Sequence, residues 1–219
     1  MAKKKRQIAA MSRRLKSAIT VTLLLIAFFL ALFDQKGFFK TSVGQSSPPS
    51  TQFTGSDDYN KYNDKFFTVI KTIDGDTFDI DIPDGGYNHT RIRLWGVDTP
   101  ETKNSKTGVM YYGPQASEFA KQTLLGKQVK IILSEKKTRD KYGRLLAYAQ
   151  LPDGRFFNEE TLKAGFGYAD VRFEHLYSYK YQQLEAAARR GKKGLWANVK
   201  FVQLPQWLQH EKPQLLGDN

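Results

Sequence analysis

The sequence predicts an α+β fold, mainly β, in which five short strands form a small barrel of the OB type with about three helices. Between residues 65 and 151, runs of β-branched and aromatic residues alternate with turn residues such as Asp-Gly and Pro-Asp-Gly. Helical spacing of apolar residues appears once within this region and twice after it. An uncharged hydrophobic stretch at residues 17–33 adds one hydrophobic N-terminal helix before the barrel.

The first three predicted strands follow one another with short turns. They cover residues 66–73, 77–82 and 90–97. Asp74-Gly75 separates the first strand from the second, and a Pro-Asp-Gly-Gly turn separates the second from the third. In the third strand, alternation puts Arg91 and Arg93 on one face and apolar residues on the other. This succession predicts an antiparallel meander.

The rest of the domain supplies two more strands and the helices. Pro114 begins a helix with one apolar face, which Gly126 ends. Strands are then predicted at residues 129–133 and 145–151, and helices at 158–163 and at about 177–190. Asn158 is expected to cap the first of these two helices. The domain is assigned to residues 65–198, followed by a tail, residues 199–219, with several apolar side chains that suit docking on another surface.

Composition limits the chemistry that is available to the chain. Its 219 residues carry a net charge of +12, but residues 66–219 contribute only +5 of this charge. The domain is therefore mildly basic, which suits a polyanionic partner without requiring one. There is no cysteine, which excludes thiolate metal sites, a cysteine nucleophile and disulfides. The three histidines lie far apart in the sequence. Any metal is therefore expected to be a hard cation held by oxygen atoms.

The N-terminus has the pattern of a membrane-targeting segment. Residues 1–16 form a basic region with no acidic residue, and residues 17–33 form an uncharged core. This asymmetry places the start of the chain in the cytoplasm and the domain across the membrane. The core is short for a spanning helix and long for a signal peptide, so an uncleaved signal-anchor and a cleaved signal both stay open. We expect a single-pass protein of the cell membrane, or a secreted one after cleavage, with residues 34–64 as a flexible linker.

Two acidic clusters lie at the ends of predicted strands. Asp74-Gly-Asp-Thr joins the first two strands, and Asp98-Thr-Pro-Glu follows the third. Each alone is an ordinary turn sequence, and neither has the spacing of an EF-hand loop. A meander can bring Asp76 beside Asp98, where both could bind one hard divalent cation. Glu101 could then take a proton from water.

A third cluster, at residues 139–144, is charged and directly precedes the fifth strand. Arginine in such a loop can bind a phosphodiester, because a pentacoordinate phosphate carries extra negative charge that a guanidinium meets with two hydrogen bonds. A charged hairpin loop facing solvent is an equally good interpretation of this loop by itself.

Four motifs occur in a fixed order, namely Asp74-Gly-Asp-Thr77, Arg93 with Val97-Asp-Thr-Pro-Glu101, Tyr112-Gly-Pro-Gln-Ala116 and Asp140-Lys-Tyr-Gly-Arg-Leu-Leu-Ala-Tyr148. In order and spacing they resemble the staphylococcal (thermo)nuclease family over about residues 66–197. The resemblance implies an OB-fold barrel with three helices, calcium dependence, and hydrolysis of DNA and RNA to 3′-phosphate and 5′-hydroxyl ends. It makes Asp76 and Asp98 the carboxylate ligands of Ca²⁺, with the Thr99 backbone carbonyl beside them.

The same resemblance assigns roles toward the substrate. Glu101 corresponds to the general base, or to the residue that orders the attacking water. Arg93 and Arg144 correspond to the arginines that bind the phosphate and stabilise its transition state. Lys141 and Tyr142 correspond to residues that contact a substrate phosphate.

One segment departs from the family pattern. Two tyrosines that flank the nucleotide in the family's best-known member correspond here to Val171 and Phe173. Phe173 can stack on a base, whereas Val171 lacks an aromatic ring. The departure concerns affinity and base preference and leaves the catalytic set complete.

Two alternatives use the same sequence differently. One is a non-catalytic OB-fold module, tethered to the membrane, that binds nucleic acid or a peptide. The other is a membrane-anchored structural or adhesion protein, which has no need of Arg93, Glu101 and Arg144 together. Because all three residues are present, we expect a nuclease, acting as a monomer on nucleic acid.

Overall fold

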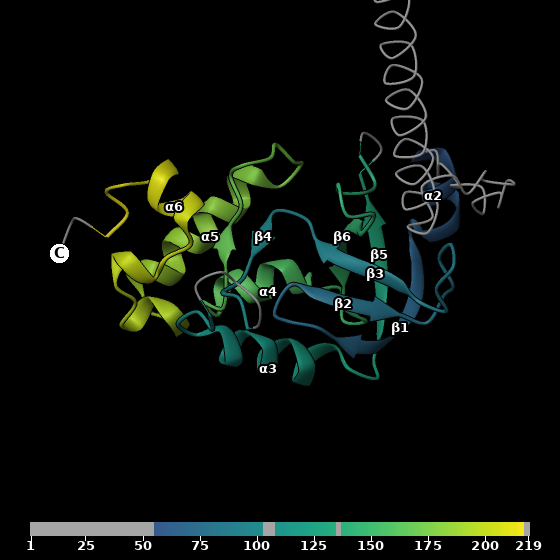
Figure 1. Cartoon of the computed structure of the whole chain (residues 1–219), viewed down its shortest axis with the longest axis horizontal. Helices are drawn as coiled ribbons and strands as arrows, with labels where there is room; N and C mark the ends of the chain where they lie inside the picture. The colour runs from purple at the N-terminus through teal and green to yellow at the C-terminus, as the bar shows by residue number, and fades with distance from the viewer. Residues whose placement is uncertain (1–54, 103–107, 135–136, 217–219) are drawn as a thin grey trace, which may run out of the picture. The chain divides into compact units, whose positions relative to one another are not determined.

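The computed structural model describes residues 55–102, 108–134 and 137–216. Its centre is a closed barrel of five strands in the order β1-β2-β3-β6-β5 (Figure 1). In chain order these strands are β1 (Lys65–Thr72), β2 (Thr77–Ile80), β3 (Thr90–Leu94), β5 (Gln128–Leu133) and β6 (Leu145–Gln150). The predicted α+β fold with a five-stranded OB-type barrel is confirmed.

Strand pairing agrees with the predicted meander. β1 pairs with β2 and β2 with β3, both antiparallel, and the connecting segments are residues 73–76 and residues 81–89. β3 then pairs in parallel with β6, and β5 closes the barrel by pairing antiparallel with β6 and with β1. The register between β2 and β3 sets Thr77 opposite Arg93. The residues that precede β2 therefore lie beside the end of β3.

Five α-helices occur in the described residues: α2 (Gly55–Tyr62), α3 (Gly113–Leu124), α4 (Phe157–Lys163), α5 (Ser178–Arg190) and α6 (Gln206–Glu211). The sequence predicted α3, α4 and α5, whereas α2 and α6 were not predicted. In Figure 1, α3 runs beneath the barrel, and α5 and α6 lie on the side of the domain where β4 (Val97–Asp98) is drawn. β4 pairs with β7 (Tyr168–Ala169) in a separate two-stranded sheet.

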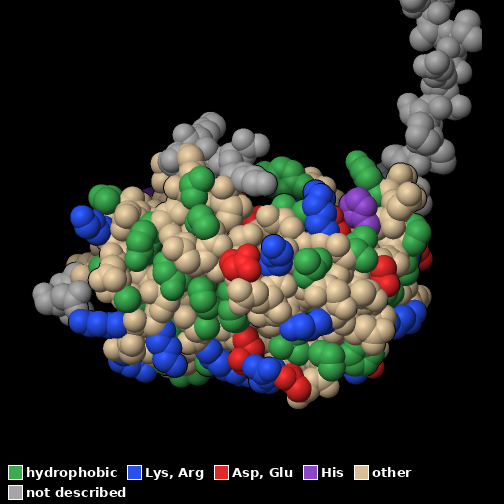
Figure 2. Space-filling view, turned by 90° about the horizontal axis from the view of Figure 1, so that it is seen from below, with side chains coloured by type: hydrophobic (Ala, Val, Ile, Leu, Met, Phe, Trp, Pro, Cys, Tyr) green, Lys and Arg blue, Asp and Glu red, His purple; other side chains and the backbone are tan. Residues whose placement is uncertain are grey.

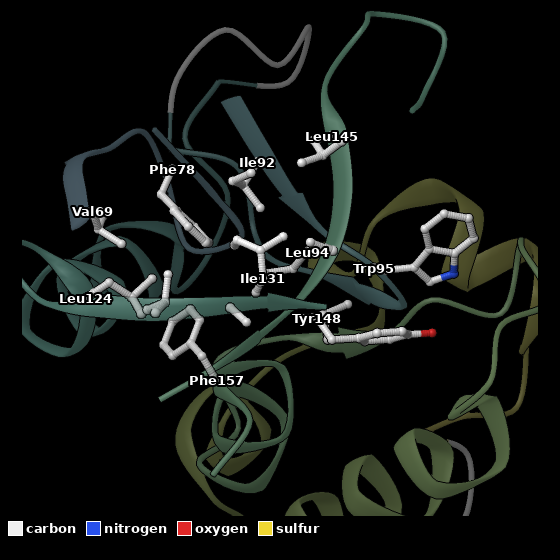
Figure 3. Packing of buried hydrophobic residues seen from close by; sticks show 14 of the residues in the cluster. Val69, Phe78, Ile92, Leu94, Trp95, Leu124, Ile131, Leu145, Tyr148 and Phe157 are labelled. Carbon is white, nitrogen blue, oxygen red and sulfur yellow. The ribbon is translucent and has the colours of Figure 1, made fainter. Parts of the chain in front are cut away.

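The hydrophobic core fills the barrel (Figure 3). All five strands and the helices α3 and α4 contribute buried side chains, including Val69, Phe78, Ile92, Leu94, Ile131, Leu145, Leu124 and Phe157. In β3 the predicted alternation is present: Ile92 and Leu94 are buried, whereas Arg91 is exposed. β2 is buried throughout, because its polar Asp79 is covered by Arg91, whose Nε lies 2.8 Å from Asp79 Oδ1.

The predicted linker ends too late in the sequence. Residues 34–64 were assigned to it, but Gly55–Tyr62 form α2. Tyr62 and Asp58 are fully buried, and Asp58 accepts hydrogen bonds from Arg139 Nη2 at 2.6 Å and from the Thr138 hydroxyl at 2.8 Å. The segment is polar, and by itself it resembles a linker. The residues that hold it in place lie about eighty positions further along the chain, so the local sequence does not show them.

Asn158 does not cap α4, contrary to the prediction. The residue preceding that helix is Phe156, and no side chain caps it. Asn158 is fully buried instead. Its Oδ1 accepts a hydrogen bond from the Ala149 N–H at 2.9 Å, and its Nδ2 donates to the Trp95 carbonyl at 3.0 Å. It thus links β6 to the chain just after β3, satisfying backbone groups that would otherwise be buried without partners.

On the face of the domain seen from below, basic and acidic side chains are not separated into patches. Figure 2 shows hydrophobic, basic and acidic side chains interspersed there. No helix in the described residues is both long and apolar enough to cross a membrane. The predicted basic region and hydrophobic segment, residues 1–33, and the linker up to residue 54 lie outside the described residues, so the membrane anchor stays a prediction.

Candidate active site

The two acidic clusters meet where β2 begins and β3 ends. Asp76 directly precedes β2, and its carbonyl accepts a hydrogen bond from the Leu94 N–H at 2.9 Å. Asp98 ends β4, five residues after Arg93. The antiparallel register of β2 and β3 brings Asp76 beside Arg93, and Arg93 contacts the carboxylates of both Asp76 and Asp98. The predicted proximity of Asp76 and Asp98 is therefore present.

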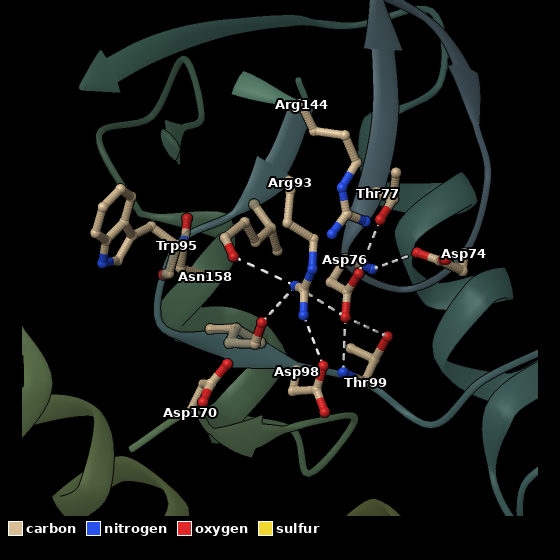
Figure 4. Close-up of polar contacts among 12 residues, drawn as sticks. Asp74, Asp76, Thr77, Arg93, Trp95, Asp98, Thr99, Arg144, Asn158 and Asp170 are labelled. Atoms are coloured by element: carbon tan, nitrogen blue, oxygen red, sulfur yellow. Dashed lines mark hydrogen bonds and ion pairs between the residues drawn. The ribbon is translucent and has the colours of Figure 1, made fainter. Parts of the chain in front are cut away.

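Arg93 lies between the two carboxylates (Figure 4). Its Nη1 is 3.0 Å from Asp76 Oδ2, and its Nη2 is 2.6 Å from Asp98 Oδ1. Nη1 also donates to the Val97 carbonyl at 2.5 Å. The Arg93 side chain is only 11% exposed, so one buried guanidinium is fixed by two acidic groups and the backbone.

Asp76 is held by threonines on both of its oxygens. Thr77 Oγ1 donates to Asp76 Oδ1 at 2.9 Å, while the backbone N–H of Thr99 donates to Oδ2 at 2.7 Å. Gly75 makes this approach possible, because a Cβ there would stand 2.8 Å from Thr99 Oγ1. The glycine of the Asp-Gly-Asp motif is thus required by close packing against Thr99.

Electrostatics at this point favour a bound cation. Burial raises the pKa of Asp76 to about 6, and the opposing effect of Arg93 does not cancel it. Burial likewise raises the pKa of Asp98, again against Arg93. Arg93 contacts Asp76 and Asp98, and Arg172 contacts Asp98 and Asp170, so three largely buried carboxylates share two guanidinium groups and negative charge is in surplus. A hard divalent cation with oxygen ligands fits this donor set.

The protein donors at the site are few. Within the described ranges, no group of three or more His, Cys, Asp or Glu side chains has the arrangement of a metal site. Asp76 and Asp98 supply two carboxylates, so a cation here would take its other ligands from backbone carbonyls and water. Thr99, the third predicted ligand, directly follows Asp98 in the chain and contacts Asp76.

Glu101 stands at the edge of this group. The residue is solvent-exposed, yet surrounding protein atoms partly desolvate its carboxylate and raise its pKa, as do Asp76 and Asp98. Arg93 and Arg144 act in the opposite direction, so Glu101 lies within electrostatic range of the carboxylate pair and of both arginines. The three predicted catalytic residues therefore lie within electrostatic range of one another, and their catalytic roles stay a prediction.

Arg144, Lys141 and Tyr142 come from the loop before β6. Arg144 Nε donates to Asp140 Oδ2 at 2.7 Å, which fixes the guanidinium. Tyr142 is 70% exposed, with Lys141 Nζ 5.0 Å and Arg144 Cζ 5.5 Å from the centre of its ring. Two positive charges and an exposed aromatic ring therefore lie together, and Figure 4 shows Arg144 near Arg93 and Asp76.

Three further residues line the site, although no motif in the sequence pointed to them. Arg172 Nη2 lies 2.8 Å from Asp170 Oδ2 and 3.5 Å from Asp98 Oδ1. Trp207 Nε1 donates to Asp98 Oδ2 at 2.7 Å. Asp170 and Arg172 lie in the segment that departs from the family pattern, and Trp207 lies in the tail. In the sequence, Trp207 was recognisable only as one of several apolar residues in a tail to which no function was assigned.

The segment after β7 also presents an aromatic residue. Phe173 is 56% exposed, with Lys137 Nζ 5.4 Å from the centre of its ring. Val171 is half-buried. Phe173 is therefore open to stacking against a flat ligand, whereas Val171 is not.

Comparison with known proteins identifies relatives. Residues 91–198 match the family model described as staphylococcal nuclease homologue. The thermonuclease of Staphylococcus hyicus is 38% identical over 137 residues, which covers 62% of this chain and 78% of that protein. The thermonuclease of Staphylococcus intermedius is 38% identical, over 59% of this chain and 75% of that protein. Endonuclease YncB of Bacillus subtilis is 34% identical, over 62% of this chain and 63% of that protein. With its barrel and its acidic and arginine residues in place, this chain belongs to the staphylococcal nuclease family.

Proposed function

We propose that this chain is a calcium-dependent nuclease that hydrolyses phosphodiester bonds of DNA, RNA or both, with 3′-phosphate and 5′-hydroxyl products. The observation that carries the proposal is the arrangement of Asp76, Arg93 and Asp98, in which two buried carboxylates share one guanidinium. Thermonucleases and an endonuclease among the relatives support the reaction class. We further propose that the domain acts outside the cytoplasm, as residues 1–33 predict.

Asp76 and Asp98 would hold the cation, with the Thr99 carbonyl and water beside them. Carboxylate and carbonyl oxygens are the ligands that Ca²⁺ prefers, and Ca²⁺ tolerates an irregular shell with several waters. When bound, the cation would neutralise charge on the phosphate and favour ionisation of water.

Glu101 would accept the proton of the attacking water. Its raised pKa makes it a stronger base than an ordinary glutamate, and its exposure lets water reach it. The water oxygen would bond to phosphorus while the bond from phosphorus to the 5′ oxygen breaks, and that oxygen would take a proton from solvent water and leave as a hydroxyl.

Arg93 and Arg144 would stabilise the charge that develops on the phosphate oxygens. Both guanidinium groups are held in place before any substrate arrives, Arg93 by two carboxylates and Arg144 by Asp140. Donors that are fixed in advance need no reorganisation during the reaction. Lys141 and Tyr142, on the exposed loop nearby, would contact a neighbouring phosphate of the substrate.

Digestion of plasmid DNA by the purified full-length chain tests the proposal. With Ca²⁺ the plasmid should be degraded, and excess chelator should abolish degradation. Glu101→Gln should lose most of the activity, while Glu118→Gln, an exposed glutamate on α3, should keep it. A folded chain that binds DNA but leaves it intact with Ca²⁺ would show a non-catalytic module instead.

A further inference from the structure

The C-terminal segment folds back onto the part of the chain that carries Asp98. After the short 3₁₀ helices η1 (Gly194–Ala197) and η2 (Phe201–Gln203), helix α6 packs against the domain. Leu204 and Leu208 are buried with Tyr168 of β7 and Ala188 of α5 in a second hydrophobic cluster. β7 is the partner strand of β4, which ends at Asp98.

Trp207 on α6 contacts Asp98 directly. Its indole N–H donates to Asp98 Oδ2 at 2.7 Å, while Arg93 Nη2 lies 2.6 Å from the other oxygen, Oδ1. The Asp98 side chain is 15% exposed. Both oxygens of this carboxylate are therefore fixed by different donors, one of them 109 residues away in the sequence.

The Trp207 ring is itself held on two sides. Arg172 lies over the ring, with Cζ 4.4 Å from the ring centre. Arg172 cannot move freely, because its Nε and Nη2 each donate to one oxygen of Asp170 at 2.8 Å. Tyr168 approaches the Trp207 ring edge-on, at 6.5 Å between ring centres. These contacts determine the direction in which the indole N–H points.

A second link ties α6 to the same two-stranded sheet. Lys212 Nζ, just after α6, lies 3.7 Å from Glu185 Oε1 on α5. Glu185 Oε2 accepts a hydrogen bond from the Ala169 N–H at 2.7 Å, and Ala169 pairs with Val97. The tail is thus attached to β4 and β7 both through Asp98 and through the backbone of β7.

We propose that Trp207 is a positioning residue of the active site, whose indole N–H orients the Asp98 carboxylate for cation binding. The inference rests on the proposed role of Asp98 as a metal ligand. The family model matches residues 91–198, so Trp207 lies beyond the matched region. In this chain the segment after residue 198 would therefore complete the site.

The chemistry of the indole suits this task. Tryptophan is a neutral donor that cannot accept, so it restrains one carboxylate oxygen and leaves the negative charge available to a cation. A lysine in its place would neutralise that charge. Hydrogen bonds that orient metal ligands typically contribute about 10-fold to 100-fold in metal affinity.

Trp207→Phe and Trp196→Phe form a matched pair for the test. Each removes one indole N–H and keeps an aromatic ring in the same hydrophobic cluster. Trp196 Nε1 is buried with no hydrogen-bond partner among the described residues, so its loss breaks no such bond. Calcium affinity of the full-length chain would be measured by calorimetry, and stability by urea unfolding.

We expect Trp207→Phe to weaken Ca²⁺ binding about 10-fold or more, and Trp196→Phe to leave it unchanged. Loss of stability in both variants, with equal Ca²⁺ affinity in both, would show a purely structural role and overturn the inference. A wild-type chain that does not bind Ca²⁺ would overturn the proposed function itself, and the inference with it.

An NMR measurement on the wild-type chain keeps the test decisive if Trp207→Phe does not fold. The chain has three tryptophans, hence three indole N–H signals. Trp95 Nε1 and Trp196 Nε1 are both buried without a partner in the described part of the chain. Titration with Ca²⁺ should therefore move the Trp207 signal most. A Trp207 signal that stays in place at saturating Ca²⁺ would contradict the proposal.

Discussion

Thr99 donates two hydrogen bonds to one oxygen of Asp76. Its backbone N–H lies 2.7 Å and its hydroxyl 3.0 Å from Asp76 Oδ2. Asp76 is nearly inaccessible to water, so these donors replace the hydration that its carboxylate loses on folding. Thr99, which directly follows Asp98, thereby joins the two halves of the acidic site.

We expect Thr99→Val to lower the free energy of unfolding by about 1–3 kcal/mol, because a buried carboxylate loses one of its donors. Calcium binding should weaken as Asp76 loses its fixed orientation. Thr99→Ser keeps the hydroxyl and should stay close to wild type. Urea unfolding and calorimetric titration measure both effects, and equal stability of the Val and Ser variants would contradict the role of the hydroxyl.

Arg144→Ala should reduce turnover of DNA about 100-fold or more, because it removes a fixed donor for the phosphate transition state. Arg155→Ala is the matched control: Arg155 also pairs with a nearby aspartate, Asp153, but on the exposed loop before α4. It should retain full turnover. Initial rates on a labelled oligonucleotide with Ca²⁺ compare the two. Similar rates in the two variants would remove Arg144 from the mechanism.

Leu208→Ala should destabilise the domain by about 2–5 kcal/mol, the usual cost of emptying a fully buried leucine site. Leu208 is 0% exposed in the cluster formed with Tyr168 and Trp196. Leu176→Ala, at a position that is 80% exposed, should change stability little. Urea denaturation provides the comparison. An unchanged unfolding midpoint for Leu208→Ala would mean that α6 does not contribute to the folded core.

His175 should make stability depend on pH. Burial lowers the pKa of His175 below its usual 6.5, because the neutral ring is favoured in the fold. Its Nδ1 accepts a hydrogen bond from the Tyr177 N–H at 3.3 Å and lies 3.2 Å from the Tyr148 hydroxyl. A proton on Nδ1 would break the bond from Tyr177.

The sign follows from the direction of the shift. Above about pH 6.5 the ring is neutral in both the folded and the unfolded chain, so His175 does not reduce the free energy of unfolding. As the pH falls below that value, the unfolded chain binds a proton that the folded chain resists, so stability is lost. His175→Gln should reduce this loss between pH 7.5 and about 5. His210→Gln, at an 89% exposed side chain, should not. Equal pH dependence in the two variants would exclude His175 as the source.

Much of the barrel could be predicted from local patterns. The alternation in β3 shows directly which residues face the core, because side chains in a strand point to opposite faces in turn. Connections without a helix between β1, β2 and β3 imply antiparallel pairing, and that pairing is enough to bring Asp76 beside Arg93. The helix that begins at Gly113 was also recognisable from its apolar face and its proline.

The sequence by itself determined the strand order of the meander, the three main helices and the family to which the motifs point, since each depends on neighbouring residues or on ordered motifs. Tertiary structure decided that α2 is part of the domain, that Asn158 bridges strands rather than capping a helix, and that Trp207 reaches Asp98. The residues in these contacts are not neighbours in the sequence, so no repeating pattern of residue types along the chain reveals them. A buried carboxylate or amide takes whichever donor the packed chain brings within reach, and only the folded arrangement of the helices determines which donor that is.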